Sequence, residues 1–314
     1  MKFDLIRTHP GTFHADDVFA VACLLLINPK ASVVREDVEI STTRLCKQDY
    51  VKGEVNDVIV DIGGRYYPVA GFFDHHQASF KEVHSIVPNP ILEDNKVWPM
   101  AAFGLIWRHF GFKICSCDQE VYEWMERNLV CYNDALDNGI EIVGNQASLT
   151  DIVDDFNCLP EIDQDLRFTK AVAWAQAVII ARMAQARKYA AGYRTVKAIL
   201  SENRSDTIEV PGGYYWFAPL LELNTQRTTP ILWVIYYRQD KTWAVQAVST
   251  LKAQFTPQYA FPESWRGLTG EVLKQVTALD TSIFCHKSGH LYVCKIKDDA
   301  IASIFKMKEY YDLP

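Results

Sequence analysis

Short apolar runs alternate with one helix-length stretch over the first part of the chain. Phe3–Arg7, Asp57–Ile62 and Val69–Phe73 are short, rich in branched or aromatic residues, and each ends where polar residues begin. Asp16–Ile27 is apolar over about three helical turns, and Ser32–Thr42 again has the β-branched content of a strand. This order of strand, helix and further strands predicts an α/β fold with a largely parallel sheet flanked by helices.

The kind of predicted element changes near residue 190, from helices to strands. Helices are predicted over Pro99–His109, Asp118–Asp137 and Leu166–Ala191. Strand-like runs follow at Thr207–Val210, Ile231–Tyr237, Trp243–Val248, Ile283–His286 and Leu291–Ile296. We therefore expect a metal-binding catalytic domain over residues 1–165, a connecting helix over 166–191, and a smaller α/β substrate-binding domain over 192–314.

Composition narrows the class of protein. The 314 residues are 49% hydrophobic and 23% charged, as in globular proteins. No apolar run approaches the ~20 residues that cross a bilayer, so no membrane partner is expected. The first strand leaves no room for a signal or transit peptide, which favours a cytoplasmic protein. The net charge of −7 gives no support for a nucleic-acid coat protein, although a small basic groove is not excluded.

Candidate chemistry gathers where the strands end. His9, His14, Asp16 and Asp17 lie within nine residues after the first strand. Either aspartate alone would be read as a helix cap, but capping needs one acceptor and not four side chains. Asp61 ends the second apolar run before two glycines, where an isolated aspartate is as often a turn residue.

Asp74, His75 and His76 follow the third apolar run. Adjacent histidines point to opposite sides of an extended chain, so one can bind a metal while the other faces a substrate. The carboxyl ends of parallel strands share one edge of a sheet, where ligands gather. Imidazole and carboxylate groups at three such ends predict a centre for two divalent cations, of the kind that clamps a phosphoryl group in transfer.

These residues resemble the DHH phosphoesterase superfamily, and within it the melanocyte-proliferating-gene-one exonuclease family. The matching segments run in order along nearly the whole chain: His9-x-Gly11-Thr12-Phe13-His14-x-Asp16, Asp61-Ile62-Gly63-Gly64, Asp74-His75-His76-Gln77-x-Ser79-Phe80, Asn133-Asp134-Ala135-x-Asp137-Asn138-Gly139, Phe261-Pro262-Glu263-Ser264-Trp265-Arg266-Gly267-Leu268 and Phe284-x-His286-x-Ser288-Gly289. The N-terminal motifs are the more specific ones.

The resemblance implies a set of ligands. The first metal would be held by His9, His14 and Asp61, and the second by Asp16, Asp61, His75 and Asp134, with Asp61 bridging the two ions. Asp61, His75 and His76 would be the catalytic residues, with His76 on the scissile phosphate. Mn²⁺ is the expected ion and Mg²⁺ the alternative, and a hydroxide between the two ions would be the nucleophile.

The C-terminal motifs imply substrate binding by Arg266 and His286. A guanidinium group binds phosphate in a bidentate manner, although a lone arginine is more often part of a surface ion pair. Trp265 is equally compatible with stacking on a base and with packing in a core. The substrate domain was expected to close over the metal centre, with these residues facing a cleft.

Three functions remain open from the sequence. The leading one is a metal-dependent phosphodiesterase, acting as a 3′–5′ exonuclease on single-stranded RNA or short oligonucleotides. The second is a small-molecule phosphohydrolase, such as a pyrophosphatase or a cyclic-dinucleotide phosphodiesterase. The third is a non-catalytic metal-binding scaffold, against which the intact ligand set argues. A homodimer is left open.

Overall fold

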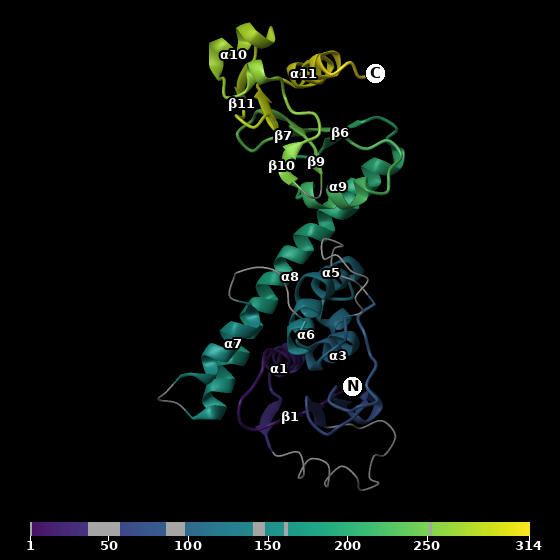
Figure 1. The fold of residues 1–314 in the computed structure, drawn as a ribbon, viewed down its shortest axis with the longest axis vertical. Coiled ribbons are helices and arrows are strands. Elements are labelled where there is room, and N and C mark those ends of the chain that lie inside the picture. The colour runs from purple at the N-terminus through teal and green to yellow at the C-terminus, as the bar shows by residue number, and fades with distance from the viewer. Residues whose placement is uncertain (1, 37–56, 86–97, 141–147, 160–162, 251–252) are drawn as a thin grey trace. The chain divides into compact units, whose positions relative to one another are not determined.

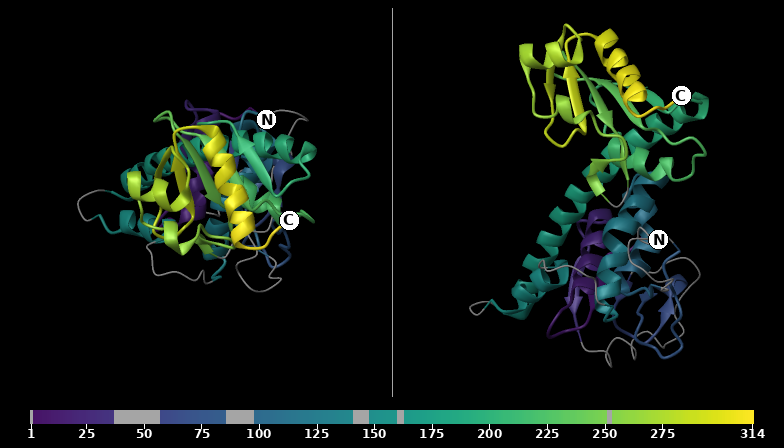
Figure 2. Two further views of the ribbon diagram at one scale, coloured as in Figure 1. Left: turned by 90° about the horizontal axis from the view of Figure 1, so that it is seen from above. Right: turned by 45° about the horizontal axis from the view of Figure 1, so that its top comes forward.

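A computed structural model describes residues 2–36, 57–85, 98–140, 148–159, 163–250 and 253–314 (Figures 1 and 2). The part of the predicted Ser32–Thr42 strand beyond residue 36 lies outside these ranges. The chain divides into two compact units, residues 1–187 and 188–314, each of which is described by itself. In the described residues, no helix combines the length and the apolar content needed to span a membrane.

The first unit contains a five-stranded sheet in the order β2-β1-β3-β5-β4. Its strands are β1 (Leu5–Thr8), β2 (Ser32–Arg35), β3 (Asp57–Val60), β4 (Tyr66–Tyr67) and β5 (Phe72–Phe73). β1 pairs in parallel with β2 and β3, and β3 pairs in parallel with β5. Only the short β4 runs antiparallel to its neighbour. The predicted α/β fold with a largely parallel sheet is confirmed.

Helix α1 (Ala15–Ile27) lies at the centre of the helical layer. Every residue from Ala15 to Leu24 is buried, because α1 packs against α3 (Ala102–Ile106), α6 (Cys131–Asp137) and α7 (Leu149–Asn157). Phe19 of α1 and Phe103 of α3 bring their ring centroids to 5.3 Å. The polar residues at the start of α1 are therefore held in a rigid environment.

The two predicted helices after residue 98 are present, with one shift in bounds. A helical segment runs through α3, the π-helical turn η2 (Trp107–Gly111) and α4 (Phe112–Ile114). It starts later than predicted because Val83 and Pro99 form a β-bridge. It passes Gly111 because a Cβ there would lie 2.6 Å from the Trp107 ring, so only glycine permits this packing.

The second segment runs through α5 (Gln119–Met125), the π-helical turn η3 (Glu126–Val130) and α6, as predicted for residues 118–137. Asp118 caps this segment, since its carboxylate accepts a hydrogen bond from the Val121 amide.

The long helix α8 spans Gln164–Glu202 and is 39 residues long. The predicted helix ends at Ala191, where the composition of the chain changes. Gly192 remains helical in the structure, and a Cβ on it would come within 1.9 Å of the Tyr215 carbonyl oxygen. Glycine therefore serves a close backbone approach here rather than a helix end.

The second unit is built on a five-stranded sheet in the order β11-β12-β8-β7-β6. Its strands are β6 (Thr207–Val210), β7 (Trp233–Tyr237), β8 (Trp243–Ala247), β11 (Ser282–Cys285) and β12 (Leu291–Cys294). Only β6 and β7 are parallel. A two-stranded ribbon of β9 (Ser249–Thr250) and β10 (Ala253–Pro257) and the helices α9 (Phe217–Asn224), α10 (Gly270–Thr277) and α11 (Lys297–Tyr310) complete the unit.

Candidate metal centre

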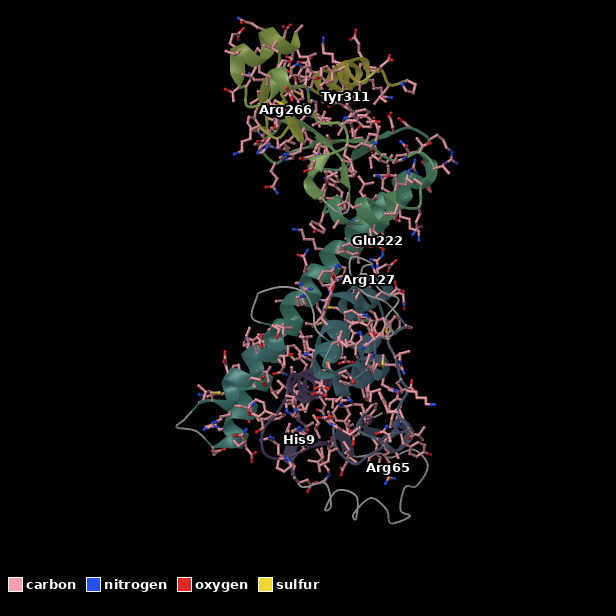
Figure 3. All side chains as sticks on the ribbon, in the orientation of Figure 1. His9, Arg65, Arg127, Glu222, Arg266 and Tyr311 are labelled. Atoms are coloured by element: carbon pink, nitrogen blue, oxygen red, sulfur yellow. The ribbon has the colours of Figure 1, made fainter. Side chains whose placement is uncertain are left out.

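The predicted ligands of the first unit come from the carboxyl ends of adjacent parallel strands. His9 follows β1, Asp61 follows β3, and His75 lies two residues after β5. Asp16 lies at the start of α1 and Asp137 is the last residue of α6. Because β1, β3 and β5 are neighbours in the sheet, their ends bring these side chains together (Figure 3, where His9 is labelled).

Asp61 lies between two groups of side chains. Its Oδ2 is 3.4 Å from Nε2 of His9, and its Oδ1 is 3.2 Å from Nε2 of His75. Its backbone is left-handed, with φ of 57°, where the chain leaves β3 toward Gly63 and Gly64. One oxygen therefore serves each group, which is the arrangement of a bridging carboxylate.

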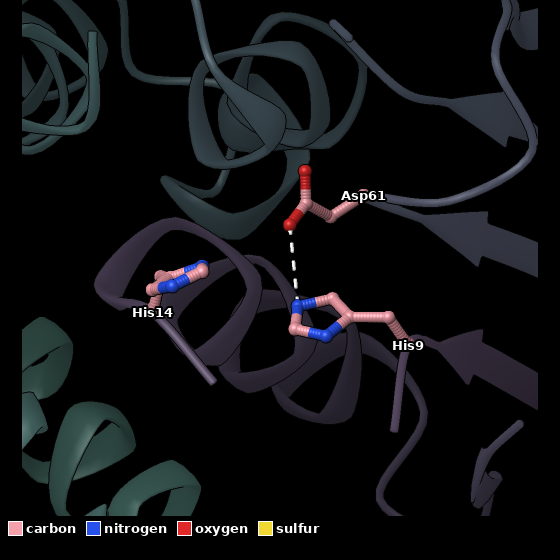
Figure 4. Close-up of side chains that lie close together, drawn as sticks. All are labelled: His9, His14 and Asp61. Carbon is pink, nitrogen blue, oxygen red and sulfur yellow. Dashed lines mark ion pairs between the residues drawn. The ribbon is translucent and has the colours of Figure 1, made fainter. Parts of the chain in front are cut away.

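The first group consists of His9, His14 and Asp61, whose potential ligand atoms lie within 4.8 Å of one another (Figure 4). Nδ1 of His9 is 3.1 Å from the Pro10 carbonyl oxygen, so this nitrogen carries the hydrogen and donates it. When the ring is neutral, Nε2 of His9 therefore carries the lone pair that a metal requires.

The second group consists of Asp16, His75 and Asp137. Nε2 of His75 is 3.5 Å from Oδ2 of Asp16 and 3.4 Å from Oδ2 of Asp137. Oδ2 of Asp16 also accepts a hydrogen bond from the Ala102 amide at the start of α3. That contact fixes a side chain that is fully buried.

Asp134 is not part of either group, and this corrects the ligand set predicted for the second metal. Its two oxygens accept hydrogen bonds from the amides of Ala101 and Gly104 and from Nε2 of His84. A Cβ on Gly104 would lie 1.9 Å from Oδ2 of Asp134, so the carboxylate is enclosed by α3. Asp137, three residues later, reaches His75 instead.

The sequence gives no indication that His84 and Glu126 form a buried cluster with Asp134. Both are buried, and Nδ1 of His84 lies 2.5 Å from Oε1 of Glu126 while its Nε2 lies 2.9 Å from Oδ2 of Asp134. The pKa of His84 is raised: burial opposes the charged ring, but its hydrogen bonds with Asp134, Cys131 and Glu126 outweigh that effect. A single histidine in Val83-His84-Ser85 carries no pattern, so only the fold reveals this cluster.

Asp17 supports the centre without belonging to either group. Its Oδ1 accepts a hydrogen bond from the His14 amide at 2.9 Å, as a helix-capping residue does, and its Oδ2 lies 3.2 Å from Nε2 of His9. Both interpretations weighed for this residue, the cap and the member of the site, are thus partly realised. Burial is the largest influence on the Asp17 carboxyl and raises its pKa to about 6.

His76 differs from His75 in being open to solvent, with 63% of its side chain exposed against 10% for His75. Nδ1 of His76 is 2.8 Å from Oδ1 of Asp74, and the Asp74 carboxylate also accepts hydrogen bonds from the amides of Gly64 and His76. Asp74 therefore orients His76, and it raises the pKa of that ring.

The electrostatics of the two groups fit a cation. Burial alone would lower the pKa of His9 and His75, yet the neighbouring carboxylates raise both to about 11. Burial and the charge of Asp16 raise the pKa of Asp137 to about 9. Buried carboxylate oxygens without a hydrogen-bond partner among the described residues include Asp16 Oδ1, Asp17 Oδ2 and Asp61 Oδ1. Such oxygens gathered at one point are what a bound cation would satisfy.

The chain matches a known protein family over most of its length. A family model described as an uncharacterised protein family (UPF0160) and labelled MYG1_exonuc matches residues 5–306. The chain belongs to the MYG1 family. The MYG1 exonuclease of Rattus norvegicus is 30% identical over 91% of this chain and 80% of its own length. The human MYG1 exonuclease is 30% identical over 95% of this chain and 84% of its own. A MYG1 protein of Chlamydia trachomatis is 28% identical over 92% and 91%.

Solved structures resemble this MYG1 chain only distantly. A pGpG-specific phosphodiesterase, PggH, from Vibrio aligns over the whole of both chains with a TM-score of 0.30 and 13% identity. RecJ from Thermus thermophilus aligns over 99% of this chain and 50% of its own, with a TM-score of 0.28 and 13% identity. Structural similarity at this level supports no conclusion about this chain.

The MYG1 motifs of the second unit bring Arg266 and His286 into one loop region. The Phe261 amide donates to the Gly289 carbonyl, and Nε of Arg266 donates to the Phe261 carbonyl at 2.6 Å. A Cβ on Gly289 would lie 2.7 Å from that Nε, so glycine is needed for this contact. Nδ1 of His286 is 2.9 Å from Oγ of Ser288.

Trp265, for which stacking on a base and packing in a core were both open, lies in the core. It is 6% exposed and stacks on Phe261 with ring centroids 5.9 Å apart. It therefore supports the loop that carries Arg266 (labelled in Figure 3) and presents no face to a ligand.

Proposed function

We propose that this protein is a metal-dependent phosphodiesterase, acting as a 3′–5′ exonuclease on single-stranded RNA or short oligonucleotides. The observation that carries the proposal is the position of Asp61, whose two oxygens face two separate groups of ligands. A carboxylate shared between two adjacent metal sites is typical of enzymes that act at phosphate, and a scaffold protein has no need of it.

The two groups suit Mn²⁺, with Mg²⁺ as the alternative, because they combine imidazole and carboxylate without thiolate. His9, His14 and Asp61 would hold one ion, and Asp16, Asp61, His75 and Asp137 the other. Bound there, two cations supply an activated water and neutralise charge on the phosphate. The exposed ring of His76, oriented by Asp74, is placed to donate a hydrogen bond to the scissile phosphate.

Substrate contacts are also proposed for Arg266 and His286 in the second unit. Nε of Arg266 is held by the Phe261 carbonyl, and its side chain remains 28% exposed. The terminal nitrogens of that guanidinium can therefore bind a phosphate without loss of the anchoring hydrogen bond. The first unit would then supply the metal chemistry and the second unit would bind substrate, as expected from the sequence for the two domains.

The choice of an exonuclease is supported by relatives that carry this name, which span most of the present chain. Polarity and preference for RNA are expectations of the family resemblance. The cytoplasmic location and the possibility of a homodimer stay predictions.

One assay tests the proposed function. Purified protein with Mn²⁺ should shorten 5′-labelled single-stranded RNA stepwise from its 3′ end, and chelation should stop the reaction. Asp61→Asn should be inactive, because one amide oxygen cannot bridge two cations. The control is Asp155→Asn, at an exposed carboxylate of α7 outside the centre. Hydrolysis of pyrophosphate or cyclic dinucleotides with no action on RNA would instead assign a small-molecule phosphohydrolase.

A further inference from the structure

A second candidate site lies in the second unit, at the carboxyl ends of its two parallel strands. Val210 ends β6 and pairs with Tyr236 near the end of β7. The chain beyond these ends lines a cavity of about 470 Å³ that is open to solvent. This volume is in the range of small-ligand sites, and the carboxyl ends of parallel strands are where such sites form.

The walls of this cavity are aromatic. Tyr214 and Tyr237 are 47% and 42% exposed at its surface, although large aromatic side chains are usually covered. Trp216 and Tyr236 also line the cavity, with ring centroids 5.5 Å apart, and Trp216 is only 7% exposed. The exposed Tyr237 ring packs against Trp243, with ring centroids 5.2 Å apart.

The backbone around the open tyrosines is fixed by glycine. A Cβ on Gly212 would lie 2.4 Å from the Tyr237 carbonyl oxygen, so the turn before Tyr214 is pressed against the end of β7. Gly213 follows with φ of 86°. The backbone that carries Tyr214 is therefore held beside the end of β7, and Tyr214 and Tyr237 both line the cavity.

Two positively charged side chains line the same cavity as these rings. Lys188 of α8 is exposed, and its Nζ lies 5.3 Å from the centroid of the Tyr215 ring. Arg238 follows β7, and its Nη2 is 3.1 Å from Oδ2 of Asp240. Lys188 and Arg238 against Asp240 leave the lining with a net positive charge, in a chain whose net charge is −7. Local positive charge beside exposed rings favours an anion that carries flat bases.

We infer that this aromatic cavity binds single-stranded nucleic acid, with bases stacked on Tyr214 and Tyr237 and phosphates bound by Lys188 and Arg238. The inference deepens the proposed function and rests on it for the biological substrate, since the cavity would retain a strand during successive cleavages. It adds contacts separate from the metal ligands and from Arg266 and His286.

Binding is tested on the full chain in a chelating buffer, with a fluorescein-labelled single-stranded RNA and fluorescence anisotropy. Lys188→Ala/Arg238→Ala should weaken binding about tenfold and reduce the slope of log affinity against log salt by about 1.4, at roughly 0.7 for each lost phosphate contact. The matched control is Arg204→Ala/Lys295→Ala, which removes the same charge at exposed positions outside the cavity. Equal affinity and slope in the two double variants would overturn the inference.

Stacking is tested separately. Tyr214→Ala should weaken binding at least about fivefold, whereas Tyr214→Phe should bind as the wild type does, because every base stacks on either ring. Tyr310→Ala, at another exposed tyrosine, is the control. A single-stranded DNA of the same sequence should respond to the variants as RNA does. Displacement of the RNA by poly-glutamate of equal charge would show a general anion site instead.

The two proposals fail in different ways. The cavity variants should leave the Mn²⁺-dependent hydrolysis of bis(p-nitrophenyl) phosphate unchanged, because that small diester needs only the metal centre. Normal RNA binding that depends on Lys188 and Tyr214, without any hydrolysis, would refute the proposed function and keep this inference. Normal RNA hydrolysis and binding in all cavity variants would refute this inference and keep the proposed function.

Discussion

At the scale of the residue, two aspartates one helical turn apart have separate tasks. Asp137 ends α6 with its carboxylate 3.4 Å from His75, while Asp134 is enclosed between His84 and the first amides of α3. Both fit the same short motif, so spacing does not distinguish them. The difference comes from which face of α6 meets α3, a tertiary contact that the local sequence does not encode.

Paired variants separate these tasks. Asp137→Asn should lose metal-dependent activity and keep a melting temperature near that of the wild type. Asp134→Ala should lower the free energy of unfolding by about 3–5 kcal/mol, because it removes the acceptor for the buried His84 Nε2 and for the amides of Ala101 and Gly104. Thermal unfolding and phosphodiesterase assays measure both. An active Asp137→Asn variant would show that another carboxylate, and not Asp137, is the metal ligand.

Proton competition gives a second prediction at this scale. The carboxylates around His9 and His75 raise the pKa of both rings to about 11, so the metal-free rings carry protons at neutral pH. A cation must displace those protons, and its apparent affinity should therefore rise with pH, by about tenfold per pH unit for each proton released. Calorimetric titration with Mn²⁺ in buffers of different ionisation enthalpy counts the protons. Binding that is independent of pH would contradict this electrostatic picture.

At the scale of the element, strands were more predictable than helix ends. The apolar runs before His9 and Asp61 form β1 and β3, because branched residues and a following polar turn are local signals. The third run, Val69–Phe73, is a strand only at Phe72–Phe73, since Pro68–Ala70 form the 3-10 turn η1. Helix bounds failed where a distant group decided them. Pro99 was assigned to a helix but pairs with Val83 in a β-bridge, and the long helix was ended at Ala191 although it continues through Gly192 beside the Tyr215 backbone.

Gly192 offers a test by sign. In an ordinary exposed helix, glycine to alanine stabilises by up to about 1 kcal/mol. Gly192→Ala should destabilise the protein instead, because its Cβ would meet the Tyr215 carbonyl oxygen at 1.9 Å. Ala191→Gly, at the exposed neighbouring position, should cost only the helix propensity, about 1 kcal/mol. Denaturant unfolding compares the two, and a stabilising Gly192→Ala would refute the close approach.

At the scale of the whole molecule, each unit has its own core and its own candidate site. All the proposed metal ligands belong to residues 1–187, and the aromatic cavity belongs to residues 188–314. The sequence predicted two domains from the change from helices to strands near residue 190. It gave no sign of the cavity, because Tyr214 and Tyr237 lie in segments whose proximity depends on the pairing of β6 with β7.

Metal removal should therefore act on one unit. Addition of Mn²⁺ at 100 times its dissociation constant should stabilise the first unit by ~2.7 kcal/mol through mass action. Hydrogen exchange with and without chelator should show the change at α1 and the ends of β1 and β3, and little at β7 and β8. Equal changes in both units would show that the metal centre controls the stability of the entire chain.

The left-handed backbone of Asp61 restricts which amino acids can occupy that position. A φ of 57° is comfortable for glycine, asparagine and aspartate, and costs other residues roughly 1–2 kcal/mol. Glycine has no ligand atom, and the asparagine amide offers one oxygen where two are needed. Glutamate keeps the carboxylate but has a longer arm and an unfavourable backbone. Conformation and coordination chemistry thus select the same single side chain independently, so this position has no conservative replacement.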